Sequence, residues 1–474
     1  MNNQPVTPKP VSYAELPGSF TLGEDSAVAI KSDTAYQEIE RTTGAYLADL
    51  LDIGIAVSGD IVLLHDETMP ADESYVLTVT EEETVLKSGS PEGLFRAAQT
   101  LRQLFPPDGS RSDKSASIRC AEIHDAPAYP YRGLMIDVAR HFFPKEVIMR
   151  QIDLAALYKL NKLHLHLTDD QGWRIEIKSR PALTEIGGQG AVGGAPGGFY
   201  TQEDYKEIVA YAAARYIEVI PEIDMPGHVN AALMSIPELN PDGVSAEQRT
   251  DTEVGVSTLQ CRSEATYAFC DDVIREMASL TPSRYIHIGG DEAHITAAED
   301  YDYFIARVCE TAKKYGKTTI GWNPYDRAEI FPGSVLQNWD RFPDREEGDK
   351  TNYAAQKKMS VILSPAGAYL DMKYNEKTAR GLMWRGPVNL ERSYDWTLEE
   401  TAPDNAVIDI ESTIWTETIL TQDDMDYMLY PRLIANAEVG WTKGARDFSG
   451  FTERLAAELK RLDALGVKYC RDYE

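Results

Sequence analysis

From about residue 130 onward, short apolar segments alternate with longer amphipathic segments. Eight of the apolar segments have the length and flanking turn residues of buried strands. They are residues 133–139, 162–168, 216–222, 285–289, 318–322, 334–339, 361–365 and 407–413. Strands that alternate with helices form parallel sheets, so eight of them over roughly 320 residues predict a (β/α)8 barrel, the TIM barrel, with inserted loops.

The first 125 residues follow a different pattern. Residues 61–64 and 75–79 are strand-like, and residues 93–105 have apolar positions at helical spacing until Pro106 and Pro107 end the helix. This pattern predicts a small α+β domain over residues 1–125, followed by a polar link over 108–117. We expect residues 126–474 to form the barrel, closed by an amphipathic helix at 449–468.

Charge and composition narrow the possible partners. The chain has 474 residues, with 76 acidic against 47 basic residues and a formal charge of −29. This balance argues against nucleic acid or an anionic membrane as a partner, because both require basic patches. The N-terminus lacks the pattern of a signal peptide, so we expect a cytoplasmic protein, although a trimmed secreted form fits equally well.

The five cysteines (Cys120, Cys261, Cys270, Cys309 and Cys470) are scattered and form no CxxC motif. They fit reduced thiols and argue against thiolate metal sites. Only Cys261 and Cys270 are close in sequence, and the sequence leaves open whether they form a bridge. The sequence does not indicate an oligomeric state.

Polar and aromatic side chains follow every predicted barrel strand. They are Arg140, His141, Asp169, Asp170, Glu222, Asp224, His228, Asp291, Glu292, Trp322, Trp339, Tyr369, Asp371, Trp415 and Glu417. The carboxyl ends of barrel strands meet at one face, which is where barrel enzymes carry their active sites. The long connection 226–280 fits a functional loop on the same face.

The segment 285–292 is the most informative of these strand ends. An apolar strand leads through Gly289 and Gly290 directly to the neighbouring carboxylates Asp291 and Glu292. The glycines allow close approach to the backbone. Neighbouring residues on a strand point to opposite sides, so we expect the two acids to have different roles.

The residue types favour a neutral carbohydrate ligand. Carboxylates and arginine bind hydroxyls, and tryptophan offers a flat apolar face to the C–H side of a sugar ring. Four tryptophans lie at strand ends or beyond, at 322, 339, 384 and 415. No phosphate-binding glycine loop accompanies them.

A metal-dependent hydrolase is the main alternative from the residues alone. His164 and His166 share one strand face, as in metal-dependent amidohydrolase barrels. However, they lie inside an apolar strand, and His287, also mid-strand, gives no clear third nitrogen ligand in register. Hydrogen-bonded interior histidines are the commoner case, so we expect no metal and no cofactor.

Five segments together resemble one enzyme family. They are Asp137-Val-Ala-Arg140-His141-Phe, Asn161 to Trp173 with Thr-Asp169-Asp170, Pro221-Glu-Ile-Asp224-Met-Pro-Gly-His228, His287-Ile-Gly-Gly-Asp291-Glu292 and Trp415-Thr-Glu417. Their order and spacing resemble the β-N-acetylhexosaminidases of glycoside hydrolase family 20, over about residues 130–445. The first 125 residues are similar to the small domain that precedes the barrel in that family.

The resemblance implies catalytic roles for four residues. Glu292 would be the general acid that protonates the glycosidic oxygen. Asp291 would orient the 2-acetamido N–H of the substrate, whose own carbonyl oxygen attacks and forms an oxazolinium ion. Asp169 and His228 would form a relay that tunes Glu292.

The resemblance also implies a set of substrate contacts. The acetamido oxygen would be held by Tyr369, and Trp384 would line the pocket mouth. The acetyl methyl and the sugar face would be enclosed by Trp322, Trp339 and Trp415. Ring hydroxyls would be bound by Arg140, Asp371 and Glu417.

These roles set opposite requirements on the two neighbouring acids. Glu292 must be protonated near the working pH, so we expect a raised pKa in a partly apolar site. Asp291 must be an anion, or a strong acceptor, to stabilise positive charge on the oxazolinium. Asn323, which follows Trp322, replaces an expected acidic residue and alters contacts on the leaving-group side.

The sequence therefore predicts a retaining exo-β-N-acetylhexosaminidase. It would release terminal N-acetylglucosamine or N-acetylgalactosamine through an oxazolinium intermediate. Release of a disaccharide such as lacto-N-biose is an alternative within the fold. A non-catalytic sugar-binding barrel is an alternative of another class, which the intact pair Asp291–Glu292 disfavours.

Overall fold

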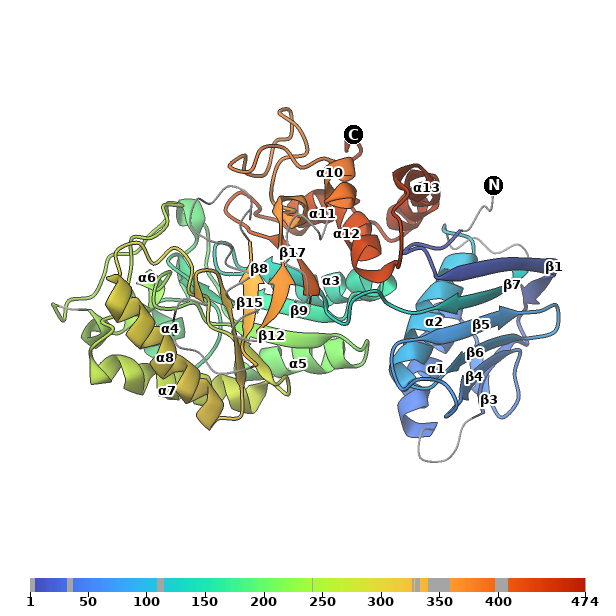
Figure 1. Cartoon of the computed structure of the whole chain (residues 1–474), viewed down its shortest axis with the longest axis horizontal. Helices are drawn as coiled ribbons and strands as arrows, with labels where there is room; N and C mark the ends of the chain where they lie inside the picture. The colour runs from blue at the N-terminus through green and yellow to red at the C-terminus, as the bar shows by residue number, and fades with distance from the viewer. Residues whose placement is uncertain are drawn as a thin grey trace.

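The computed structural model describes residues 5–31, 37–108, 115–240, 242–325, 328, 333–339, 359–396 and 408–473. A mixed sheet with two helices (blue in Figure 1) stands beside a closed barrel formed by the rest of the chain. The predicted fold class, a TIM barrel preceded by a small α+β domain, is confirmed.

Eight parallel strands close the barrel in chain order, each pairing with the next and the last with the first. They are β8 (Arg132–Asp137), β9 (Lys162–His166), β12 (Glu218–Glu222), β13 (Tyr285–His287), β14 (Thr318–Trp322), β15 (Val335–Asn338), β16 (Ser360–Leu363) and β17 (Ile408–Ile414). All eight predicted strands are present, because strands covered on both faces are continuous apolar runs.

Helices cover the outside of the barrel (Figure 1). The described helices are α3 (Lys145–Leu157), α4 (Ala182–Glu185), α5 (Gln202–Ala213), α6 (Asn230–Ser235), α7 (Glu264–Leu280), α8 (Ala298–Lys314), α10 (Leu390–Asp395), α11 (Gln422–Leu429), α12 (Arg432–Trp441) and α13 (Phe448–Ala464). Short 3-10 turns lie at η1 (Val192–Gly194), η2 (Pro237–Leu239) and η4 (Ala366–Ala368). The predicted closing helix is α13, with Phe451, Leu455 and Leu462 buried.

The N-terminal sheet has the strand order β1-β7-β5-β6-β4-β2-β3. Its strands are β1 (Ser12–Leu22), β2 (Ala27–Ile30), β3 (Gly54–Ala56), β4 (Ile61–His65), β5 (Tyr75–Val79), β6 (Thr84–Ser88) and β7 (Ala116–Asp125), with helices α1 (Gln37–Leu51) and α2 (Pro91–Leu104). Helix α2 begins at Pro91, two residues before the predicted helical segment 93–105, with Ser90 accepting a hydrogen bond from Gly93 N–H. The predicted polar link is shorter than expected, because β7 already begins at Ala116.

Buried ion pairs join the N-terminal sheet to the barrel. Glu73 accepts hydrogen bonds from the guanidinium groups of Arg96 and Arg132, and these two arginines hold its pKa at about 2 although burial opposes ionisation. Lys159 lies 2.9 Å from Asp125 and donates to it, and both side chains are fully buried. These contacts lie at the amino ends of the barrel strands, so they attach the sheet to the end opposite the predicted active site.

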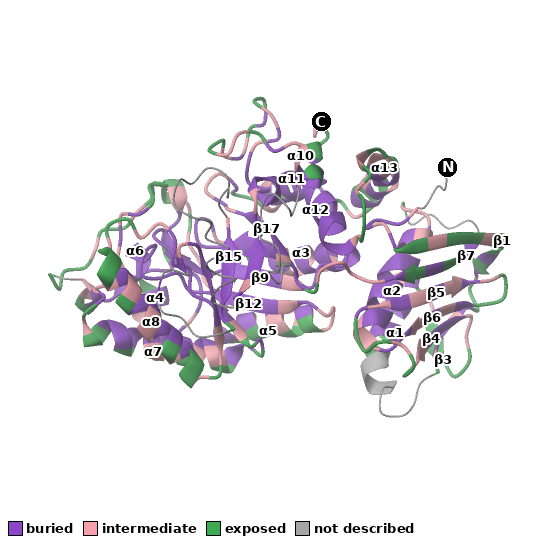
Figure 2. Cartoon of the chain, viewed as in Figure 1, coloured by how far each residue is buried: buried purple, intermediate pink, exposed green. Residues whose placement is uncertain are grey.

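The interior of this barrel is more polar than that of most TIM barrels. Buried layers of Val, Ile and Leu fill most barrels of this type. Here Tyr131, Ile220, Ile320, Val335 and Ile362 form a small apolar cluster, and the level above it holds charged side chains. Figure 2 shows that the barrel strands are buried over most of their length, and the first residue of several strands, such as Lys162 of β9, is partly exposed.

All five cysteines are free and buried, so Cys261 and Cys270 form no bridge. Among the described helices, none combines the length and apolarity needed to cross a membrane.

Candidate active site

The predicted site residues gather at the carboxyl ends of the barrel strands around a pocket of about 480 Å³. Nine of them line it: Arg140, Asp291, Glu292, Trp322, Trp339, Tyr369, Trp384, Trp415 and Glu417. The other three, Asp169, His228 and Asp371, are buried beside it. The strand-end pattern therefore located one continuous site.

The loop after β13 presents the two neighbouring acids. Gly289 has φ +65°, and a Cβ built on it would lie 1.7 Å from Asp224 Oδ1, so only glycine fits there. Gly290 N–H donates to the same oxygen over 3.1 Å. Glu292 itself has φ +44°, in the left-handed region that a residue with a side chain rarely adopts. The sharp turn thus depends on glycines packed against a buried carboxylate.

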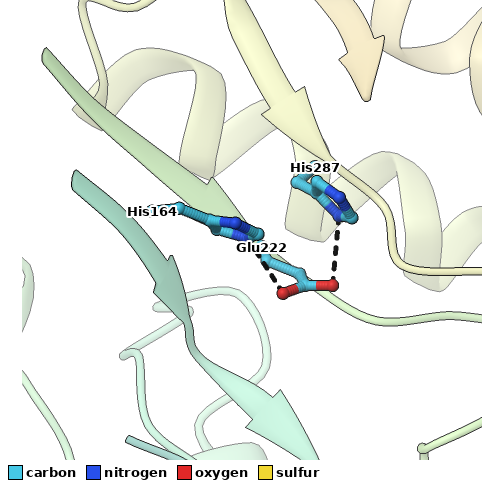
Figure 3. Close-up of side chains that lie close together, drawn as sticks. All are labelled: His164, Glu222 and His287. Atoms are coloured by element: carbon cyan, nitrogen blue, oxygen red, sulfur yellow. Dashed lines mark ion pairs between the residues drawn. The ribbon is translucent and has the colours of Figure 1, made fainter. Parts of the chain in front are cut away.

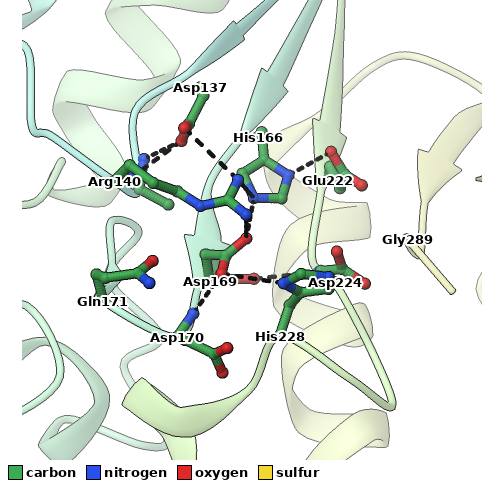
Figure 4. Close-up of polar contacts among 12 residues, drawn as sticks. Asp137, Arg140, His166, Asp169, Asp170, Gln171, Glu222, Asp224, His228 and Gly289 are labelled. Atoms are coloured by element: carbon green, nitrogen blue, oxygen red, sulfur yellow. Dashed lines mark hydrogen bonds and ion pairs between the residues drawn. The ribbon is translucent and has the colours of Figure 1, made fainter. Parts of the chain in front are cut away.

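Asp169 and His228 connect this turn to the rest of the site (Figure 4). Asp169 lies 2.8 Å from Arg140 Nη2, 2.8 Å from His166 Nε2 and 3.2 Å from His228 Nδ1. The other nitrogen of His228, Nε2, lies 3.5 Å from Glu292 Oε2 and 4.0 Å from Asp291 Oδ2. Asp169, His228 and Glu292 therefore form a row of neighbouring groups, which is the arrangement that the predicted relay requires.

The electrostatics of the pocket contradict the predicted raised pKa of Glu292. Burial opposes ionisation of Glu292, but the hydrogen bond and positive charge of His228 lower the pKa of Glu292. We had predicted a raised pKa from the apolar walls alone. The reason for the difference is that Asp169 and Asp224 hold the pKa of His228 well above its usual value despite burial, so a cation faces Glu292.

Asp291 also differs from its neighbour in its ionisation. Burial raises the pKa of Asp291 to about 6, opposed by His228 and reinforced by the charges of Glu292 and Glu222. Asp291 is therefore an anion at neutral pH and neutral in mild acid. The two acids do have different environments, as expected, but it is the pKa of Asp291 and not that of Glu292 that is raised.

Aromatic side chains form the pocket walls. The rings of Trp322 and Trp415 lie 5.8 Å apart, and Trp384 packs edge-on against Tyr369 at 5.2 Å and Trp339 at 6.1 Å. Trp384 is 50% exposed, as expected for a residue at the mouth, whereas Trp322 is 1% exposed. The walls thus run from a closed floor to an open rim.

Three polar residues fit the binding of hydroxyl groups. Arg140 lies over the ring of Trp415 at 4.9 Å and next to the pocket. Neither oxygen of buried Asp371 accepts a hydrogen bond from another described side chain. Oε2 of Glu417 likewise accepts none from a described side chain. Burial raises the pKa of Asp371, which the charge of Glu417 reinforces. A sugar hydroxyl would supply the missing donor.

Several functional residues were not predicted as part of the site. Thr252 and Val254 reach the pocket from the long connection after β12, which agrees with the predicted functional loop, and Leu382 also lines the wall. Loop residues have no strand register to mark them. Glu222 appeared among the strand-end residues, but the sequence gave it no role.

The reasoning against a metal site was wrong in one respect. His287 does lie in register, paired with Glu222 across neighbouring strands, and its ring stacks on His164 at 4.6 Å. Both rings face Glu222 (Figure 3). The same carboxylate also accepts a 2.7 Å hydrogen bond from the indole N–H of Trp322, which can donate but not ligate. Glu222 is therefore surrounded as a buried anion is by nitrogen groups, more than as a metal ligand is.

Comparisons with known proteins place the chain in a family. Residues 129–444 match the glycosyl hydrolase family 20 catalytic domain, and residues 3–126 match its domain 2. A Cellulomonas fimi β-N-acetylhexosaminidase is 42% identical over 85% of this chain and 81% of its own length.

Solved structures agree over nearly the whole chain. The Streptomyces plicatus N-acetyl-β-hexosaminidase in complex with Thio-NAglucal superposes with a TM-score of 0.94 at 42% identity, covering 99% of this chain and 97% of that one. The Vibrio harveyi exo-β-N-acetylglucosaminidase in complex with N-acetylglucosamine gives a TM-score of 0.88 at 32% identity, over 100% and 79% of the two chains. This chain is a glycoside hydrolase and belongs to glycosyl hydrolase family 20.

Proposed function

We propose that this protein is a retaining exo-β-N-acetylhexosaminidase that uses the acetamido group of its substrate as the nucleophile. The observation that carries the proposal is the placement of Asp291 and Glu292 in the lining of an aromatic-walled pocket, with His228 against Glu292. The relatives named above, which act on or bind N-acetylhexosamines, support it.

The pocket fits one terminal sugar. A pocket of about 480 Å³, whose lining runs from buried Trp322 to exposed Trp384 and Val254, suits the end of a glycan better than an internal unit. Trp322, Trp339 and Trp415 would enclose the acetyl methyl, and Tyr369 would donate to the acetamido oxygen. Arg140, Asp371 and Glu417 would bind the ring hydroxyls.

In the first step, the acetamido oxygen attacks the anomeric carbon while the bond to the leaving oxygen breaks. Glu292 gives its proton to that oxygen. Asp291 accepts the hydrogen bond of the acetamido N–H and stabilises the positive charge of the oxazolinium. In the second step Glu292 takes a proton from water, which attacks the same carbon and restores the acetamido group with retention.

The lowered pKa of Glu292 is compatible with its role as proton donor. The raised pKa of His228 and the lowered pKa of Glu292 favour the imidazole as the carrier of the proton between them before a sugar binds. A bound sugar displaces water from the pocket, and loss of hydration disfavours an ion pair relative to the neutral pair. Substrate binding thus moves the proton onto Glu292, next to the leaving oxygen.

Inhibition by a thiazoline mimic of the oxazolinium tests the proposal. The mimic gains interactions that develop only during the reaction, so it should bind far more tightly than N-acetylglucosamine. Asp291→Asn should weaken that inhibitor and slow turnover. Trapping of a covalent glycosyl–carboxylate by a 2-fluoro sugar would show instead that an enzyme carboxylate attacks, and release of a disaccharide would show that the enzyme is not a monosaccharide-releasing hydrolase.

A further inference from the structure

Glu222 occupies a position that the proposed mechanism does not use. It ends β12, is fully buried, and does not line the pocket. Four nitrogens surround its two oxygens, and together with their residues they form the Glu222 cluster (Figures 3 and 4). The cluster consists of Glu222, His164, His166, His287 and Trp322.

One oxygen of Glu222 holds a wall of the pocket. The indole N–H of Trp322 donates to Oε1 over 2.7 Å, and His287 Nδ1 lies 3.0 Å from the same atom. Trp322 lines the pocket where the acetyl group would bind. A buried charge-assisted hydrogen bond fixes both the position and the rotation of an aromatic ring. This contact therefore sets one face of the acetyl site.

The other oxygen leads to the general acid. His166 Nδ1 lies 2.6 Å from Glu222 Oε2, and His166 Nε2 lies 2.8 Å from Asp169. His166 has a carboxylate at each ring nitrogen, so it donates from both and carries a positive charge, in line with a pKa that these partners hold well above the usual value against burial. Asp169 then holds His228 against Glu292.

The charge of Glu222 is required by this arrangement. An amide in its place would present an N–H₂ group to at least one of the surrounding nitrogens and could not balance a cationic His166. Although burial opposes its ionisation, the neighbouring imidazoles hold the pKa of Glu222 well below the usual value. A single buried anion is thus bonded toward both the acetyl site and the acid.

We propose that Glu222 is a positioning residue for the reaction, whose buried carboxylate fixes Trp322 in the pocket wall and, through His166 and Asp169, holds His228 against Glu292. The inference rests on the proposed function, since it assigns Glu222 to that reaction. It predicts that removing the charge of Glu222 weakens both binding of the acetyl group and proton donation by Glu292, because the Trp322 wall and the acid relay lose the same partner.

Glu222→Gln tests the coupling. We expect kcat/KM to fall by about tenfold to a hundredfold for aryl glycosides with poor leaving groups, and much less for activated ones, because weakened proton donation matters most for basic leaving groups. The same variant should bind the thiazoline mimic about tenfold more weakly, since the acetyl wall is no longer fixed. Loss of folded protein alone would lower every rate by one factor and leave inhibition constants unchanged.

Variants that break a single contact separate the two effects. Trp322→Phe removes the indole donor together with part of the ring, and it should weaken the thiazoline mimic without changing the dependence on leaving group. His166→Asn leaves the Trp322 bond intact and should mainly sharpen the dependence on leaving group. These two variants also decide the matter if Glu222→Gln does not fold, because identical defects in both would overturn the proposal.

Glu411→Gln is the matched control. Glu411 is an equally buried barrel carboxylate that accepts hydrogen bonds from His164, Tyr131 and Gln337; it touches the Glu222 cluster only through His164 and contacts neither Trp322 nor the acid relay. It should lower stability while keeping the leaving-group dependence and the thiazoline affinity of the parent. If Glu222→Gln behaves like this control while the parent enzyme is still strongly inhibited by the thiazoline, the role of Glu222 is refuted and the proposed function stands.

Discussion

The pKa of Asp291 offers a direct test of the charge distribution in the site. Burial, together with the neighbouring acids, raises this pKa to about 6, against the opposing charge of His228. The mechanism needs Asp291 as an anion that accepts the acetamido N–H. Activity should therefore rise as pH increases through about 6, since the carboxylate is protonated below its pKa and ionised above it.

The expected magnitude follows from this one value. With a pKa of about 6, roughly a tenth of Asp291 is ionised at about pH 5 and roughly nine-tenths at about pH 7. The pH profile of kcat/KM reports ionisations of the free enzyme. We therefore expect kcat/KM to increase by about tenfold across that interval.

The assay should use an aryl N-acetylglucosaminide with an activated leaving group. Such a group departs without full protonation, so the titration of Glu292 contributes little. The rising limb of the pH profile, where kcat/KM increases with pH, then reports the ionisation of Asp291. The pKa values of Glu292 and His228 are shifted away from this interval, one downward and one upward. Asp291→Asn serves as the control and should lose the limb along with most of the activity.

Two results would refute the reasoning. A flat profile between about pH 5 and about pH 7 would mean that Asp291 does not titrate there, so that burial does not raise its pKa as the structure indicates. A limb that persists in Asp291→Asn would belong to another group.

Three further predictions test separate parts of the site. Glu292→Gln should lower kcat by about a hundredfold or more for poor leaving groups and much less for activated ones, whereas equal losses would contradict its role as acid. Activity should survive exhaustive chelation, measured as kcat after dialysis against EDTA, and restoration by zinc after a loss would indicate a metal enzyme. Gly289→Ala should lower both thermal stability and kcat, because its Cβ would meet Asp224 at 1.7 Å. Gly316→Ala, with a similar φ of +73° but open space around it, should cost only about 1–2 kcal/mol of stability, and equal effects of the two changes would rule out the clash.

The barrel was predictable because its strands are uniform in character. Strands such as β8 are buried along their whole length, so they read as apolar runs between longer helices. The N-terminal sheet was recovered only in part. Edge strand β3 is exposed at all of its positions and β1 at most of them, so neither carries the apolar signal of a strand.

The site was predictable where strand ends place it and unpredictable where only contacts define it. Asp291 and Glu292 follow β13 directly, so topology alone brings them to the pocket. The direction of their pKa shifts depends on His228, which follows β12 and meets Glu292 only in the folded barrel. A sequence also cannot show that Glu222 is shared between a wall residue and a relay, because that requires the distances to both.

The distribution of acids within the site explains why it suits a cationic transition state. Buried carboxyl groups outnumber the buried cations around the pocket, and burial raises the pKa of Asp224, Asp371 and Glu417 as well as of Asp291. A neutral sugar can enter such a site without adding charge. In the proposed mechanism positive charge then develops on the oxazolinium, and the buried carboxylate of Asp291, already fixed in place, would stabilise this cation with little reorganisation of water. The fixed cations, Arg140 and the histidines bonded to Asp169, lie toward the acid relay. We infer that the barrel divides its charges by function: His166 and His228 support the proton donor, Arg140 lies between the relay and the pocket, and the acids Asp291 and Glu417 face the substrate.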